Sequence, residues 1–424
     1  MFPLKTITHA PLYLYCLLAS LGLQLLVLAP SATCREDTTF ADLTSPAHQY
    51  WTRPLNDPFS KLIPDFESGK IQLDTQNQLT FVTSLLKALD IPAASQMLVF
   101  STTSLQLSKI SPRNPRALYF NEDLYLGYIP GGKIEIISID PQLGGIFYIF
   151  EIPRDQGTPQ PQRAKRCMNC HADTDTRHVP GLVIKSVIPG PNGGSLNSFR
   201  REQTGHQIPL EDRFGGWHLT GADPIKKHWG NLIGQLSPAG LKKQIIQPGQ
   251  LFDFNNYPLD RSDILPQLLH EHQVGFINRV VEAGYKYRAY QDSDKGILNP
   301  AHSKELERIT SDLTRYLLFA DEANLPRGIQ GDAQFKKDFR ANRQTLASGE
   351  SLKDLDLGRH LFKYRCSYMI YSNAFQGLPK KFKQQIYQKL AKALSTDKPD
   401  PNYSYLPSAE KRIIKKLLQT TLPR

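Results

Sequence analysis

Five short runs of β-branched and aromatic residues decide the fold: MLVF (97–100), ALYF (117–120), LYLGYI (124–129), IEIISI (134–139) and GIFYIFEI (145–152). Turn-forming residues separate them, for example Pro130-Gly131-Gly132 and Asp140-Pro141. Side chains of this kind favour strands, and such short turns join neighbouring antiparallel strands. The sequence therefore predicts an antiparallel meander in the N-terminal half of the chain.

Helical periodicity is found on both sides of these strands. Residues 77–91 have the apolar spacing of an amphipathic helix, with Asn77 as its N-cap and Pro92 ending it. Beyond Ser262 the sequence predicts a helical half, with helices over 262–291, 303–320, 378–394 and 408–418, the last capped by Ser408. A further strand is predicted over 182–188, whereas residues 35–64 and 195–260 are rich in Pro, Gly and polar residues and are expected to be irregular.

The pattern predicts an α+β fold, and its composition is that of a globular protein, with 424 residues of which 40% are apolar and 21% charged. We expect a signal peptide over 1–34 and a β-rich region over 35–160. A loop-rich central segment over 161–260 and a helical region over 261–424 complete the chain. The length favours two or three domains.

The N-terminus has the features of a secretory signal. Lys5 precedes an apolar run over 12–28, and the small residues Ala29, Ser31 and Ala32 follow it. The alternatives are an uncleaved anchor that associates the chain with the membrane and a lipid-modified Cys34. The chain is therefore expected in the periplasm or on the extracytoplasmic face of the membrane.

The formal net charge of +11 favours anionic partners. The sequence has no long Lys/Arg run with interleaved aromatic residues, so we do not expect a nucleic-acid partner. An acidic protein remains as the expected partner, and a solvated basic surface is the plainer alternative.

Cys167-Met168-Asn169-Cys170-His171 matches the CxxCH pattern of covalent haem attachment. Two thiols at this spacing reach the two vinyl groups of one porphyrin, and the adjacent imidazole is placed as the proximal iron ligand. A CxxC redox pair would favour a βαβ context, and a zinc site would need a second ligand pair, which the sequence lacks. The sequence therefore predicts one covalently bound haem c on Cys167, Cys170 and His171.

Five blocks of the chain resemble a family of exported proteins with a cytochrome c-like haem motif. They are LVFSTTSLQLSKISPRNPRALYFNEDLYLGYI (98–129), DPQLGGIFY (140–148), CMNCHADTDTRHVPGLVIKSV (167–187), GHQIPLEDRFGGWHLTG (205–221) and YRCSYMIYSNAFQGLP (364–379). The resemblance extends over roughly residues 70 to 420. It implies one haem per chain and no established reaction. It also implies that His206, His228 and His272 lie in family motifs, as His171 does.

The far side of the iron needs a sixth ligand or stays open. His272 falls within an apolar stripe from Leu265 to Tyr287 at helical spacing, so it is expected to be buried, with either the iron or another protein group as its partner. His270 lies about 200° around the helix from His272 and is expected to face outward. Met369, in an aromatic stretch, is the second candidate ligand, and its plainer role is core packing.

Other residues near the motif were considered for smaller roles. Trp217 and Trp229 would cover porphyrin surface or form ordinary aromatic core. Arginines at 200, 201 and 213 are of the type that pairs with haem propionates, although surface solvation is their default role. Cys366 is a lone thiol for which we expect a buried apolar role.

These features predict an exported monohaem cytochrome that transfers electrons and docks an acidic redox partner, an electron carrier rather than an enzyme. The excess chain length motivates one alternative, a haem enzyme that is peroxidase-like or part of a larger oxidoreductase. A haem-based sensor of a small ligand is the other alternative.

Overall fold

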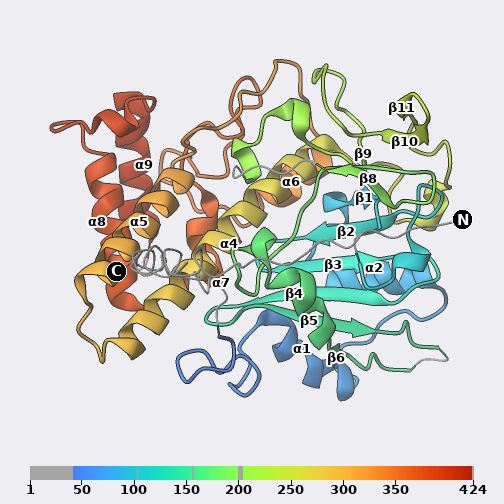
Figure 1. Ribbon diagram of the computed structural model, residues 1–424, viewed down its shortest axis with the longest axis horizontal. Coiled ribbons are helices and arrows are strands. Elements are labelled where there is room, and N and C mark those ends of the chain that lie inside the picture. Colours follow the sequence, from blue (N-terminus) through green and yellow to red (C-terminus); the bar gives the residue numbers. More distant parts are fainter. Residues whose placement is uncertain (1–41, 103, 155–156, 199–203, 423–424) are drawn as a thin grey trace, which may run out of the picture. The chain divides into compact units, whose positions relative to one another are not determined.

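A seven-stranded antiparallel sheet is the main β element of the computed structural model, which describes residues 42–102, 104–154, 157–198 and 204–422 (Figure 1). Its strand order is β6-β5-β4-β3-β2-β1-β9. The meander comprises β1 (Met97–Val99), β2 (Arg116–Phe120), β3 (Leu124–Tyr128), β4 (Ile134–Asp140) and β5 (Gly144–Phe150), and the edges are β6 (Gln162–Arg163) and β9 (Trp217–His218). The predicted meander and the α+β class are confirmed; the two short edge strands were not predicted.

The predicted signal peptide, residues 1–34, lies outside the described residues. Residues from Phe40 to Arg424 form one compact unit. The described parts of the three regions expected after residue 34 therefore belong to one compact unit. No helix in the described part of the chain is long and apolar enough to cross a membrane.

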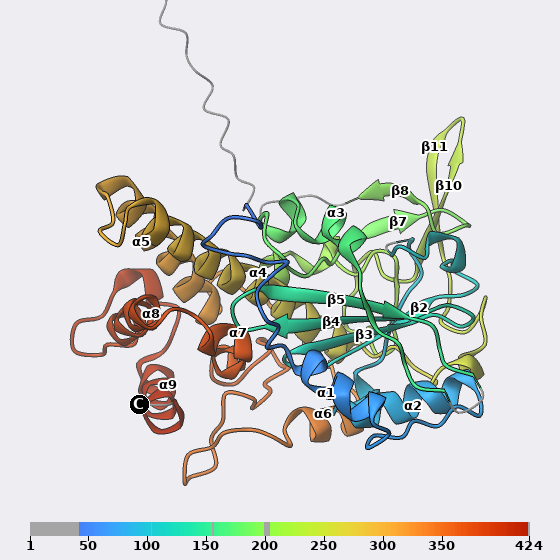
Figure 2. The same ribbon diagram turned by 90° about the horizontal axis from the view of Figure 1, so that it is seen from below.

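The two faces of the sheet are covered by different layers, because successive side chains of a strand point to opposite faces. Leu126, Ile136 and Tyr148 pack into one hydrophobic core with α1 (Pro58–Glu67) and α2 (Gln78–Ala88). Their neighbours Tyr125 and Ile137 face the other core, to which α4 (Ile264–Ser293) belongs. Figure 2 shows α1 and α2 on one side of the sheet and α3 (Met168–His171) on the opposite side.

Both helices on the first face begin at a side-chain cap. Asn77 accepts hydrogen bonds from the backbone N–H groups of Leu79 and Thr80, as predicted for this N-cap. Helix α1 was not predicted, since residues 35–64 were expected to be irregular. Asp57 caps it through the N–H of Ser60, and Pro58 occupies its first turn, where a proline is tolerated.

The C-terminal half is helical, as predicted, with shifted boundaries. Its other helices are α5 (Pro300–Leu317), α6 (Ala333–Phe339), α7 (Asn373–Gln376), α8 (Lys380–Ala393) and α9 (Ser408–Thr421). One predicted helix start and one predicted cap are corrected. Asp263 caps α4 through the N–H of Leu265, so this helix does not start at Ser262. Ser408 is the first residue of α9, and Pro407 occupies the cap position.

Helix α4 is buried on nearly all sides from Ile264 to Tyr285, because it lies between the sheet and the helical layer. The prediction that His270 faces outward is therefore wrong: its side chain is 5% exposed. A single apolar stripe describes a helix that covers one surface. This helix contacts two, so polar residues on its second face are buried as well.

The segment 182–260 also differs from the prediction. The strand predicted over 182–188 is short and shifted: β7 comprises Val187–Pro189, and it pairs with β8 (Ser195–Ser198). Within the region expected to be irregular, β10 (Leu232–Ser237) and β11 (Gly240–Ile245) form a hairpin. Its strands are largely exposed and polar, which is why the hydrophobic pattern did not reveal them.

Candidate haem-attachment site

The CxxCH residues form one short helical segment on the side of the sheet that faces α4. A single 3-10 turn (Lys165–Cys167) leads into α3. Residues three apart lie on the same side of a helix, so Cys167 and Cys170 are neighbours on its surface. Both are unpaired thiols; Cys167 is partly exposed and Cys170 is exposed. The described geometry thus presents two free thiols together, as attachment to one porphyrin requires.

His171 is held by its backbone surroundings. Its Nδ1 lies 2.9 Å from the carbonyl oxygen of Gly181, and its ring packs 4.7 Å from the ring of Phe147. A carbonyl only accepts, so Nδ1 carries the proton and Nε2 keeps the lone pair. Burial lowers the pKa of His171 to about 4, so the ring is neutral at pH 7. A neutral imidazole with its second nitrogen held by a carbonyl is the usual form of an iron ligand.

The environment of Cys167 argues against a redox-active thiol pair. Burial, followed by the nearby Glu135 and Cys170, raises the pKa of Cys167 to about 12. A catalytic CxxC cysteine needs a lowered pKa, because the thiolate is the nucleophile. Glu135 itself is paired with Arg116 at 2.8 Å, and these two charges lie on the sheet face beside the motif.

The chain after the motif is clamped onto α4. The side-chain oxygen of Asn278 accepts from the N–H of Leu182, and its side-chain nitrogen donates to the carbonyl of Leu182, both at 2.8 Å. A Cβ at Gly181 would lie 2.3 Å from the Asn278 side-chain oxygen, so this close approach requires glycine. Because Gly181 also accepts the His171 hydrogen bond, the clamp fixes the imidazole relative to α4.

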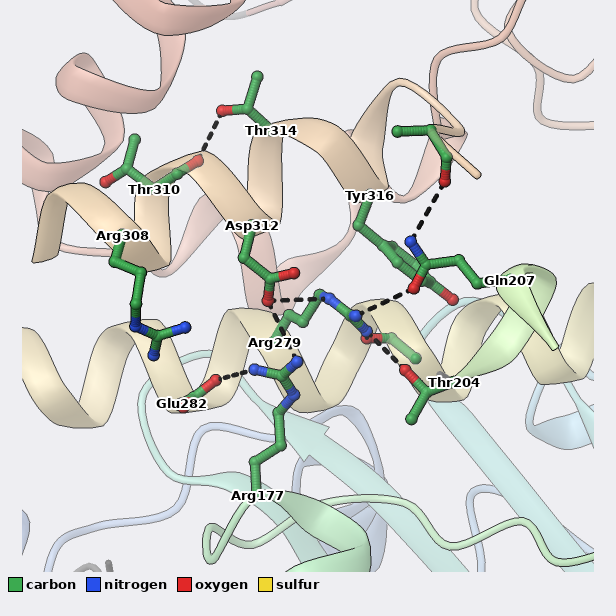
Figure 3. Close-up of polar contacts among 12 residues, drawn as sticks. Arg177, Thr204, Gln207, Arg279, Glu282, Arg308, Thr310, Asp312, Thr314 and Tyr316 are labelled. Carbon is green, nitrogen blue, oxygen red and sulfur yellow. Dashed lines mark hydrogen bonds and ion pairs between the residues drawn. The ribbon is translucent and has the colours of Figure 1, made fainter. Parts of the chain in front are cut away.

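A second attachment is the ion-pair network in Figure 3. Arg177, six residues beyond His171, pairs with Glu282 of α4 and with Asp312 of α5, the latter at 3.1 Å. Asp312 also accepts from Arg279 of α4 at 3.1 Å. Salt bridges with limited exposure and shared partners hold geometry better than isolated surface pairs. The stretch from residue 165 to residue 182, called the haem segment below after the proposed attachment, is therefore joined to α4 at two points.

A row of four side chains crosses the sheet under the motif. Phe147, Ile137, Tyr125 and Phe120 are successive partners across β5, β4, β3 and β2. Phe147, Tyr125 and Phe120 are 3 to 5% exposed, whereas Ile137 between them is partly exposed. The adjacent row on the same face contains Leu118, Glu135 and Ile149, which are also partly exposed. Ile137, Leu118 and Ile149 thus leave apolar surface incompletely covered around the Glu135–Arg116 pair, and such surface fits a porphyrin face.

The two candidate distal ligands lie in the helical layer. His272 is fully buried; its Nδ1 lies 2.8 Å from Nδ1 of His206, and its Nε2 lies 2.7 Å from the hydroxyl of Ser367. Its ring stacks on Tyr316 of α5 at 5.4 Å. Met369 is likewise 0% exposed and packs in the core around this segment. Of the two roles that the sequence left open for His272, the geometry supports the structural one.

The remaining candidates have other partners. Trp217 is buried, and its indole donates to the carbonyl of Lys185, beside the haem segment. His228 and Trp229 line an open pocket of about 900 Å³ in the loops after β9. Arg213 is buried against Glu271 at 3.3 Å, so it is not available to a propionate. Arginines 200 and 201 lie outside the described residues.

Cys366 is 0% exposed, in agreement with its expected apolar role. Within the described residues, no group of three or more His, Cys, Asp and Glu side chains is arranged to hold a metal ion. Sequence reasoning missed Gly181 and Asn278, which hold His171 in place. Their spacing gives no local signal, because one lies in a loop and the other on a helix about 100 residues later.

No family model matches the chain, and no curated protein or solved structure matches it either.

Proposed function

We propose that this chain is an exported c-type cytochrome that carries one haem on Cys167 and Cys170, with His171 as the proximal ligand, and transfers electrons. The observation that carries the proposal is the pairing of two free neighbouring thiols with an imidazole whose Nδ1 is held by Gly181. The export signal, which the sequence supplies, brings the chain to the compartment in which haem c is attached.

The role of the chain's own residues follows from this arrangement. A bound haem would supply one-electron redox chemistry. Gly181 orients the imidazole, Asn278 and Arg177 fix the haem segment to α4, and the partly exposed side chains around Ile137 provide an apolar surface. Such a site holds a redox group in one geometry, which suits an electron carrier.

The surface beside the motif supports an acidic partner. Lys165 and Arg166 are both exposed and directly precede Cys167. With the net charge of +11, they would attract an acidic redox partner to the edge where the thiols lie. Association should therefore weaken as salt is raised, since exposed charges are screened.

The test is covalent attachment in a host that possesses a c-type haem-attachment system. The purified protein should keep its haem on a denaturing gel, and its mass should exceed that of the polypeptide by one haem. Cys167→Ala with Cys170→Ala should lose both signals. Cys366→Ala is the matched control and should keep them, because this thiol is buried in the helical layer.

A parent protein that releases its haem on denaturation would overturn the proposal. Deletion of residues 1–34 provides a separate check on export, because the shortened chain should remain without haem. Full haem attachment to that chain would contradict the export part alone.

A further inference from the structure

His270 occupies an unusual position on α4. Its ring lies 5.4 Å from the ring of Phe120 and 5.7 Å from that of Tyr125, so it faces the sheet. These are two of the four residues in the row that ends at Phe147, against which His171 packs. Burial lowers the pKa of His270 to about 3, and Arg116 lowers it further, as it does for His171. Both imidazoles thus approach the same face of the sheet.

The His270 side chain lacks the hydrogen bonds that a buried imidazole needs. It is 5% exposed, and Nδ1 is buried with no partner among the described residues. Leaving a buried polar group unpaired is costly, so such groups normally have a protein, water or metal partner. This is an orphaned ligand-type nitrogen in an aromatic environment.

The row places the two imidazoles toward its opposite ends. His171 is at the Phe147 end, and His270 is at the Tyr125 and Phe120 end. Adjacent strands are about 4.8 Å apart, so Phe147 and Tyr125 are separated by roughly 10 Å along the row. Ile137, the residue between them, is the partly exposed one. A flat group standing over Ile137 would have one imidazole on each face.

Other buried histidines also have a ring nitrogen without a hydrogen-bond partner among the described residues, for example Nε2 of His206 and both ring nitrogens of His218, but they do not face this row. His206 and His272 are bonded to each other in the helical layer. His218 is on β9, with its ring between Phe100 at 4.5 Å and Phe252 at 4.8 Å; Phe252 belongs to the core on the far face of the sheet. Met97 points to the same face as the motif, as the partner of Leu118, and is the alternative donor there.

From this geometry we infer that His270 is the second axial ligand of the haem, so that the iron is held between His171 and His270. The inference rests on the proposed function and specifies its site. Coordination here donates the free imidazole lone pair to the metal and involves no other bond change. The two attachments between the haem segment and α4 keep the ligands in a fixed relation.

The experiment is performed on the purified protein once covalent haem has been established. The parent should have a low-spin spectrum, a bis-imidazole signature by magnetic circular dichroism and electron paramagnetic resonance, and no carbon monoxide binding. His270→Ala should convert the haem to high spin and allow carbon monoxide to bind. Added imidazole should restore the low-spin spectrum of this variant. His272→Ala and Met97→Leu should keep the parent spectrum.

Each alternative outcome overturns the inference while leaving haem attachment intact. A parent that is high spin and binds carbon monoxide has an open iron site, which would favour an enzyme or sensor. A parent with a histidine–methionine signature that is lost in Met97→Leu would move the ligand to Met97. A low-spin spectrum that is lost only in His272→Ala would move it to His272. If His270→Ala does not accumulate, two other measurements decide the question. One is the spectroscopic signature of the parent. The other is His270→Met, which should stay low spin and have a higher reduction potential.

Discussion

Two histidines lie two residues apart on α4 and have opposite environments. His272 faces the helical layer, where both ring nitrogens are within hydrogen-bond distance of protein groups, His206 and Ser367. His270 faces the sheet, where Nδ1 has no partner among the described residues. Both are buried, with exposures of 5% for His270 and 0% for His272, so burial does not distinguish a structural histidine from a candidate ligand. The complete account of their hydrogen bonds does.

The comparison also explains why one helix serves two purposes. On the helical side, Tyr316 donates to the carbonyl of His272 at 3.0 Å and stacks on its ring, so the hydrogen bonds of His272 itself are satisfied inside the core. On the sheet side, His270 is surrounded by the aromatic rings of Phe120, Tyr125 and Trp217. The first side stabilises the fold. On the second side, the His270 imidazole has a ring nitrogen that is free to bind another group.

The largest expected effect on stability is that of His272→Ala in the haem-free protein with Cys167→Ala and Cys170→Ala. The change leaves His206 and Ser367 without their buried partner and opens a space in the core. We expect the free energy of unfolding to fall by about 3 kcal/mol. Urea unfolding followed by far-ultraviolet circular dichroism measures it.

The matched variant is His270→Leu in the same haem-free background. No recorded hydrogen bond of the imidazole is lost, and an apolar side chain suits the aromatic surroundings, so stability should change by less than about 1 kcal/mol or increase. If His270→Leu destabilised the chain as much as His272→Ala, the two environments would not differ as described, and His270 would have a structural partner.

A smaller effect is expected where the haem segment is tied to α4. Arg177→Met removes the pairs with Glu282 and Asp312, whose side chains are 11% and 31% exposed. Partial exposure screens these charges, so we expect a loss of about 2 kcal/mol, between the values for surface and buried pairs. The haem should remain attached, and a fraction of it should become high spin as His270 is held less firmly.

The control for this prediction is Arg308→Met, which appears in the same view (Figure 3). Arg308 is 57% exposed and pairs with Glu305 on its own helix. Its removal should cost about 0.5 kcal/mol and leave the spectrum unchanged. Equal losses for Arg177→Met and Arg308→Met would show that the link between the haem segment and α4 contributes little.

Sequence reasoning was most successful where structure depends on local pattern. The alternation in IEIISI predicts β4, and Asn77 before an apolar-periodic stretch predicts the start of α2, because both signals act over a few residues. It was least successful at His270, which depends on α4 being covered on two sides. That arrangement results from the packing of two layers against the helix, so it cannot be predicted from the spacing of apolar residues within the helix.

The same limit applies to the candidate site. Cys167, Cys170 and His171 were identified from one five-residue pattern, and their attachment to haem stays a prediction. The carbonyl that holds His171 belongs to Gly181, and the side chain that holds this loop belongs to Asn278. Contacts between residues so far apart in the chain follow from the tertiary fold, so they became visible only in the structure.

A last expected effect is a pH dependence of stability that both histidines share. In the folded, haem-free chain, burial lowers the pKa of His272 and of His270 to about 3. The unfolded chain has ordinary histidine pKa values of about 6.5, so it binds more protons than the folded chain between these limits. Stability therefore falls as the pH drops below about 6.5, by up to about 1.4 kcal/mol per pH unit for each histidine, and is independent of these groups above pH 7.5.

This dependence can be measured for each of the two histidines in turn. Urea unfolding of the haem-free protein at pH 5, 6 and 7 should show the slope, and His270→Leu should reduce it by the contribution of one proton. A slope that His270→Leu leaves unchanged would contradict the burial of this imidazole, because it would mean that His270 binds its proton equally well in the folded and the unfolded chain. His272→Ala should reduce the slope by a similar amount, because burial lowers the pKa of His272 to about 3 as well.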